Sequence, residues 1–117
     1  MDAAILVHRE LGPGLLESVY EVVMAYELRK RGLDVKRQSA IPVKYKNLKL
    51  EEGFRADLLV ESKVIVELKC VEKLHNAHKK QLLTYLRLGG KTLGYLFNFS
   101  EALMKNGIVR TANGLSE

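Results

Sequence analysis

The fold of this chain is decided by residues 54–70, FRADLLVESKVIVELKC. Residues 54–60 and 64–70 are rich in aliphatic and β-branched side chains, and this composition predicts two strands. Only Glu61-Ser62-Lys63 joins them, and so short a connection requires an antiparallel hairpin. The hairpin is apolar enough to predict a place near the centre of a sheet.

Three charged side chains interrupt these apolar strands. With the turn centred near Ser62, Asp57 and Glu67 fall opposite or nearly opposite each other, with Cβ atoms about 5 Å apart. Lys69 lies two residues beyond Glu67 and should point to the same face, whereas Leu68 should point away. Burying two unpaired carboxylates is costly, so the cluster favours a functional site where both reach one cation. The alternative is that Lys69 merely pairs with both carboxylates on an exposed sheet face.

The sequence before the hairpin predicts two helices and a strand. A short helix over residues 3–10 is interrupted at Gly12-Pro13-Gly14, and a long helix follows over residues 14–31. Its recurring apolar positions are Leu15, Val19, Val22, Val23 and Tyr26. Residues 35–45 alternate with period two and predict a strand, which a turn at Lys46-Asn47 closes.

The sequence after the hairpin predicts a helix over residues 75–88 and a strand over residues 93–99. The apolar stripe of this helix is Leu82, Leu83 and Leu86. Residues 108–111 predict a last short strand. The order of elements predicts an α/β fold with a mixed central sheet flanked by helices, and we expect residues 1–117 to form one domain.

Composition narrows the class of protein. Nothing in the chain is apolar for long enough to span a bilayer, and the N-terminus turns charged at once, unlike a signal peptide. The single cysteine, Cys70, excludes an intrachain disulfide and argues against a zinc cluster. We therefore expect a cytoplasmic protein with no membrane contact.

A net charge of +5 is compatible with a polyanionic partner. The basic residues form two clusters, one of Arg29, Lys30, Arg31, Lys36 and Arg37, and another of Lys69, Lys73, Lys79 and Lys80. The clusters could form a surface that binds a polyanion, or they could be ordinary solvated helix ends and loops. Charge alone favours the second interpretation.

Motifs along the chain resemble those of one family of nucleases. Asp57 followed by Glu67-Leu68-Lys69 matches the D-x(n)-E-x-K motif of the PD-(D/E)XK nuclease superfamily, and the order of elements resembles its restriction-endonuclease-like αβββαβ core. Residues 14–20, GLLESVY, fit the G-x-x-E-x-x-Y signature of the GxxExxY proteins, a branch of that superfamily. Residues 81–85, QLLTY, resemble the Q-x-x-x-Y helix motif of RecB-like nucleases, and residues 108–115 resemble the closing segment of the branch.

The resemblance implies a metal site. Asp57, Glu67 and the backbone carbonyl of Leu68 would bind the ion, and Glu17 would add a further acidic group from the first helix. Hard oxygen ligands suit Mg²⁺ or Mn²⁺. Without the motif, Glu17 would be interpreted as an ordinary solvent-facing helix residue.

The resemblance also implies roles around the metal. Lys69 would orient a water or neutralise developing charge, and Gln81 would bond to a phosphate, a water or Lys69. Tyr85 would contact nucleic acid or brace the site, although a core aromatic is an equal alternative. Tyr20 is expected to orient Glu17. Further residues expected to meet substrate phosphates are Lys73, Lys79 and Lys80.

These residues lead us to expect a metal-dependent nuclease that acts on nucleic acid, with DNA as the expected substrate. Two alternatives stay open. One is a nucleic-acid-binding or protein-binding module on the same fold without turnover, and the other is a homo-oligomeric, structure-selective endonuclease. The motifs do not indicate strandedness, sequence preference or exo- versus endonuclease action.

Overall fold

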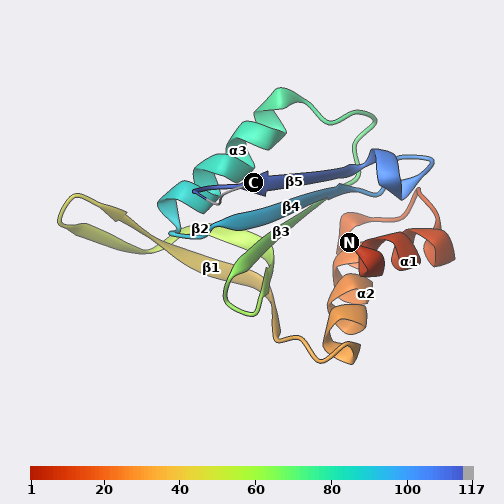
Figure 1. The fold of residues 1–117 in the computed structure, drawn as a ribbon, viewed down its shortest axis with the longest axis horizontal. Helices are drawn as coiled ribbons and strands as arrows, with labels where there is room; N and C mark the ends of the chain where they lie inside the picture. The colour runs from red at the N-terminus through yellow and green to blue at the C-terminus, as the bar shows by residue number, and fades with distance from the viewer. Residues whose placement is uncertain (115–117) are drawn as a thin grey trace.

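The computed structural model describes residues 1–114 as a five-stranded sheet with helices on both faces (Figure 1). The strands are β1 (Val35–Tyr45), β2 (Leu48–Val60), β3 (Val64–Lys69), β4 (Leu93–Asn98) and β5 (Ile108–Ala112). The helices are α1 (Asp2–Leu11), α2 (Glu17–Lys30), α3 (Asn76–Leu88) and the short 3-10 helix η1 (Met104–Asn106). Leu115, the last residue of the predicted closing segment, lies outside the described residues.

The sheet has the strand order β1-β2-β3-β4-β5 and is mixed, as the sequence predicts. β1, β2 and β3 form an antiparallel meander, β3 and β4 are parallel, and β5 returns antiparallel to β4. The crossover from β3 to β4 passes through α3, because two parallel neighbours cannot be joined by a tight turn. The predicted helix and strand over residues 75–88 and 93–99 are thus confirmed within one residue at each end.

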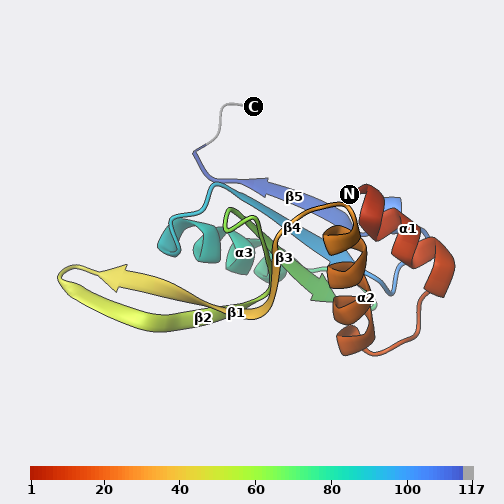
Figure 2. The same ribbon diagram turned by 90° about the horizontal axis from the view of Figure 1, so that it is seen from below.

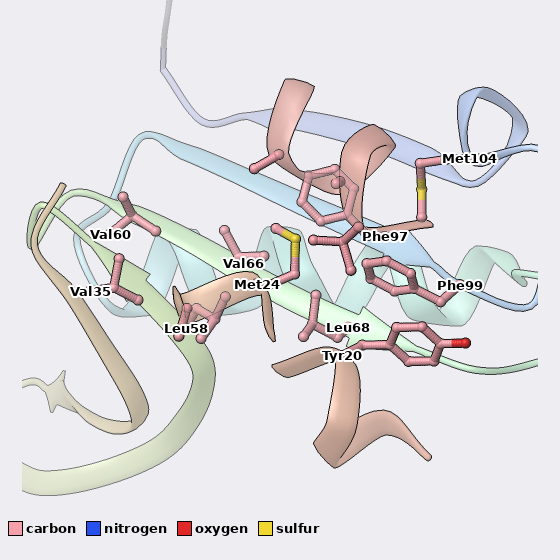
Figure 3. Close-up of a cluster of buried hydrophobic side chains, with 14 residues drawn as sticks. Tyr20, Met24, Val35, Leu58, Val60, Val66, Leu68, Phe97, Phe99 and Met104 are labelled. Atoms are coloured by element: carbon pink, nitrogen blue, oxygen red, sulfur yellow. The ribbon is translucent and has the colours of Figure 1, made fainter. Parts of the chain in front are cut away.

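Two hydrophobic clusters hold the helices to the sheet. α1 and α2 cover one face, where Tyr20 and Met24 pack with Leu58, Val66 and Phe97 (Figure 3). α3 covers the other face (Figure 2). There Leu82 and Leu86 pack on strand residues. The central strands are therefore buried on both faces, which explains their nearly continuous apolar sequence.

Of the five apolar positions that recur at helical spacing, only Val23 packs against the core, and the other four face outward. Leu15, Val19, Val22 and Tyr26 are 41%, 36%, 47% and 61% exposed. The helix instead buries Tyr20, Glu21, Met24 and Ala25 against the sheet. Both stripes have helical spacing, so periodicity alone could not tell which of them meets the sheet.

β1 and β2 continue beyond the sheet as a two-stranded arm, residues 42–53, which projects away from the rest of the molecule (Figure 2). β2 begins at Leu48, whereas the sequence predicted a start at residue 54. Residues 48–53, LKLEEG, contain only two apolar side chains among three charged ones, because their pairing with β1 lies outside the hydrophobic core. The predicted turn at Lys46-Asn47 is confirmed. None of the described helices is long and apolar enough to cross a membrane.

Candidate active site

The site lies where β2 and β3 separate. Their last regular pairs are Leu58 with Val66, Leu59 with Ile65 and Val60 with Val64. Asp57 and Glu67 are the next residues on each strand, so the two carboxylates lie on adjacent antiparallel strands, as the short connection predicts.

The two acidic side chains take the place of backbone hydrogen bonds between the strands. The backbone N–H of Asp57 donates to Oε2 of Glu67 at 2.8 Å, and the backbone N–H of Leu68 donates to Oδ2 of Asp57 at 2.8 Å. Each carboxylate is therefore held by the strand opposite its own. This reciprocal arrangement fixes both groups within the sheet and not on a mobile loop.

Glu67 and Leu68 face different sides, as their alternation predicts. Glu67 is 7% exposed, and Leu68 is 1% exposed in the cluster beneath α1 and α2 (Figure 3). The Leu68 N–H points to the β2 edge, where it meets Asp57. In extended backbone the carbonyl of the same residue points to the same edge, so an uncharged oxygen donor lies beside the carboxylates.

The regular alternation of β2 breaks at Asp57. Ala56 packs with the cluster under α3, whereas Leu58, two residues later, packs with the cluster under α1 and α2. Across the ladder, β1 pairs Arg37 with Leu58 and Ser39 with Ala56, which sets Gln38 opposite Asp57. Gln38 has φ 49, a left-handed conformation that is rare outside glycine and concentrates at functional sites.

Burial controls the protonation of the acidic pair. It raises the pKa of Glu67 from an ordinary 4.5 to about 7, and the negative charge of Asp57 adds to the rise. Burial likewise raises the pKa of Asp57, and the hydrogen bond from Leu68 opposes that rise. The pair therefore carries an unfavourable concentration of negative charge near neutral pH.

No cation of the described chain neutralises this pair directly. Within residues 1–114, Lys69 forms no ion pair with either carboxylate, although its charge lowers the pKa of both. Glu67 is buried, so the alternative of an exposed, self-paired charge cluster on the sheet does not describe this site.

Glu17 reaches the site from the first turn of α2. Its Oε2 accepts a hydrogen bond from the backbone N–H of Cys70 at 3.2 Å, just beyond the end of β3. Its negative charge also contributes to the raised pKa of Glu67. The helix and the hairpin, some fifty residues apart in the sequence, are thus brought together at the end of β3.

Tyr20 does not orient Glu17, contrary to the expectation. Its hydroxyl donates to the carbonyl of Gly12 and accepts from the N–H of Leu15, and its ring stacks on Phe99 with centroids 4.3 Å apart. It is fully buried. Tyr20 therefore fixes the loop that leads into α2, because its hydroxyl bonds to that loop while its ring is anchored in the core.

Two polar residues beside Asp57, Glu21 and Gln38, were not predicted from the sequence. Glu21 is 7% exposed, pairs with Arg37 at 3.0 Å and accepts a hydrogen bond from Gln38 at 2.6 Å. The same amide of Gln38 lies 3.3 Å from Oδ1 of Asp57. Glu21 follows Glu17 by four residues, and this spacing on one helix face was the only signal available in the sequence.

α3 presents its predicted residues unequally. Tyr85 is half-buried and stacks on Phe54 with centroids 4.0 Å apart, and burial and the charges of Glu67 and Asp57 raise its pKa. Gln81, one turn earlier, has an exposed side chain. The lysines expected to meet substrate are all exposed: Lys73, Lys79 and Lys80. His78 accepts from the N–H of His75 at 3.0 Å and so caps α3.

The donor set fits a hard divalent cation. Two carboxylates and the Leu68 carbonyl lie where β2 and β3 separate, with Glu17 nearby, and all four are oxygen donors. Burial and mutual repulsion leave the pair in need of positive charge. Among residues 1–114, no three histidine, cysteine, aspartate or glutamate side chains stand as a ready-made cage, so solvent would complete the coordination of such an ion.

Comparison with known proteins gives one match. The sequence model described as the PD-(D/E)XK nuclease superfamily matches residues 1–111. Neither the curated proteins nor the solved structures give a match. The matched residues include the whole of the site described above.

Proposed function

Because the chain belongs to the PD-(D/E)XK nuclease superfamily, we propose that it is a Mg²⁺- or Mn²⁺-dependent phosphodiesterase that hydrolyses DNA. The proposal rests on one observation: half-buried Asp57 and buried Glu67 are held reciprocally across β2 and β3 and form no ion pair with a cation of the described chain. The GLLESVY stretch at residues 14–20 supports placing it in the GxxExxY branch. One domain over residues 1–117 and a cytoplasmic location stay predictions.

The residues have separate tasks in this proposal. Asp57, Glu67 and the Leu68 carbonyl would hold the ion, with Glu17 acting directly or through water. The ion would stabilise charge on the scissile phosphate and make water more acidic. Lys69 would neutralise the charge that develops on the phosphate, because it lies next to the pair without being tied up in an ion pair. The DNA strand would be positioned by Gln81, Tyr85 and the lysines of the α3 region.

Cleavage of single-stranded, duplex and branched DNA with Mg²⁺, Mn²⁺ or EDTA tests the proposal, and thermal unfolding tests the metal site separately. Binding to the folded state raises the free energy of unfolding by mass action, by about 2.7 kcal/mol when the ion is at one hundred times its Kd. We expect Mn²⁺ to raise the melting temperature of the wild type and Asp57→Asn to abolish the rise. An unchanged melting temperature in millimolar Mn²⁺ would contradict the proposed metal site.

Glu17→Gln should weaken metal binding by about tenfold, as loss of an outer ligand usually does, with little effect on stability. The variant keeps the shape and an oxygen that can accept from Cys70, and Glu17 is exposed. Titration with Mn²⁺ measures the affinity, and Glu10→Gln, an exposed acid on α1, is the matched control. Equal affinities for Glu17→Gln and the wild type would show that the motif glutamate does not serve the metal.

The outward stripe of α2 favours a second candidate, a dimeric structure-selective endonuclease. Val19, Val22 and Tyr26 are spaced by three and four residues along α2, the spacing of a seam between two helices, and all are exposed. Antiparallel pairing with a second copy would set the basic end of one α2, at Arg29-Lys30, beside the acidic first turn of the other.

Val22→Glu should convert such a dimer into a monomer, since the charge would be buried at the centre of the seam. Light scattering during size-exclusion chromatography measures the mass. Leu103→Glu is the matched control, because Leu103 is an exposed apolar residue far from α2 in sequence. A wild type that is monomeric at every concentration tested contradicts this candidate and leaves the nuclease proposal intact.

A further inference from the structure

The arm of β1 and β2, residues 42–53, has two chemically different faces. Opposed residues on antiparallel strands share a face, and the register pairs Val43 with Leu50, Lys44 with Lys49 and Tyr45 with Leu48. Alternation therefore places the apolar pairs on one face and the lysine pair on the other. The arm is amphipathic although no part of the described core covers it.

The apolar face is open to solvent. Tyr45 is 63% exposed, Leu48 is 58% exposed and Leu50 is 43% exposed. Every residue of the arm except Val43 is exposed. Tyr45, Leu48 and Leu50 belong to neither hydrophobic cluster of the described core, and an exposed apolar face of this kind is typical of a surface that binds a partner.

The tip of the arm is basic. Lys44, Lys46 and Lys49 lie within residues 44–49, which contain no acidic residue. Lys44 and Lys49 oppose each other directly, an arrangement that lowers the stability of a sheet unless an anion lies nearby. Of the two acids of the arm, Glu51 pairs with Lys49 at 3.7 Å and Glu52 pairs with Arg55 at 2.6 Å. Lys44 and Lys46 form no ion pair within residues 1–114.

We propose that this arm binds duplex nucleic acid about one helical turn from the candidate active site, an inference that rests on the proposed nuclease function. A two-stranded ribbon fits a groove of the duplex, its lysines neutralise phosphates, and apolar side chains such as Leu48 contact base edges or sugars. Nucleic acid uses the basic tip and the apolar face together, and it is also the substrate of the proposed nuclease.

The reach of the arm sets the length of the duplex. Leu48 and Asp57 lie nine residues apart on β2, which corresponds to at most roughly 30 Å along the strand. One turn of B-DNA is about 34 Å. A duplex of roughly 8 base pairs at the site therefore falls short of the arm, whereas one of about 24 base pairs reaches it.

The test is binding of labelled duplexes to the metal-free protein, measured by fluorescence anisotropy in EDTA over a range of KCl concentrations. Lys44→Ala/Lys49→Ala should weaken binding to the long duplex by about 10- to 30-fold and flatten the salt slope by about 2. The short duplex should bind equally to variant and wild type. Tyr45→Ala/Leu48→Ala should weaken the long duplex without changing the salt slope, because these side chains carry no charge.

Lys63→Ala/Lys105→Ala is the matched control, since it removes the same charge at exposed positions away from the arm. The proposal is overturned if the control loses as much affinity, if the short duplex loses as much as the long one, or if the arm variant keeps full affinity for the long duplex. A change of oligomeric state in the arm variant, with duplex binding unchanged, would assign the arm to a second copy of the chain instead.

The outcomes separate this inference from the nuclease proposal. If duplex binding depends on the arm but the protein cuts no substrate with Mg²⁺ or Mn²⁺, the binding role of the arm is supported and the nuclease proposal is contradicted. If both arm variants cleave long and short duplexes at wild-type rates, the binding role of the arm is contradicted and the nuclease proposal stands.

Discussion

Lys69→Ala should lower the rate of DNA cleavage by about 10²–10³-fold, the usual loss for a group that stabilises charge in the transition state. Lys69 follows Glu67 by two residues on β3 and forms no ion pair with the acidic pair in the described part of the chain. Its ammonium is therefore free to meet the phosphate. Single-turnover rates at saturating metal measure the loss, and thermal unfolding should report an unchanged fold.

Lys73→Ala is the control that separates this role from a general attraction for phosphate. Lys73 is exposed in the loop after β3, so its loss should weaken DNA binding modestly and leave the single-turnover rate within about threefold of the wild type. Equal losses of rate in both variants would reduce Lys69 to one phosphate contact among several. If the wild type binds DNA tightly but cuts nothing with either metal, the binding-module alternative is favoured over the nuclease.

The sequence was sufficient for the hairpin and its acidic pair because the constraint is local. Three residues between two strands leave only antiparallel pairing, and that pairing places Asp57 opposite Glu67. The same locality made the helices and the mixed order of strands predictable. Glu17 needed the resemblance, since no local rule brings α2 to the end of β3.

The errors arose where tertiary packing chooses between equivalent local patterns. Two faces of α2 have helical apolar spacing, and the face with Tyr20 and Met24 meets the sheet because it also carries Ala25, which permits close approach. Gln38 was unpredictable for a different reason. Its place beside Asp57 depends on a left-handed backbone at one position of β1, which leaves no mark in the alternation of residues 35–45.

The raised pKa of Glu67 gives the metal-free protein a built-in pH dependence. An acid whose pKa is higher in the folded state than in the unfolded state binds its proton more tightly when folded. Its contribution to stability is fully present below pH 4.5 and is lost as the pH rises through about 7. The interval between these two values corresponds to about 3 kcal/mol of unfolding free energy, because one pKa unit is worth about 1.4 kcal/mol.

Glu67→Gln should therefore stabilise the metal-free protein by about 3 kcal/mol at pH 8 and by almost nothing at pH 4.5. Glutamine resembles the protonated acid in shape and charge, and its oxygen can accept from the N–H of Asp57 as Oε2 does now. Urea unfolding in EDTA at both pH values measures the difference, and Glu10→Gln, an exposed acid, should change neither value. With Mn²⁺ at pH 8 the order should reverse, because only the wild type keeps the charge that the cation neutralises. A Glu67→Gln variant that is less stable than the wild type at pH 8 without metal would mean that the buried carboxylate is structurally favourable, and the main physical argument for a cation at this pair would be lost.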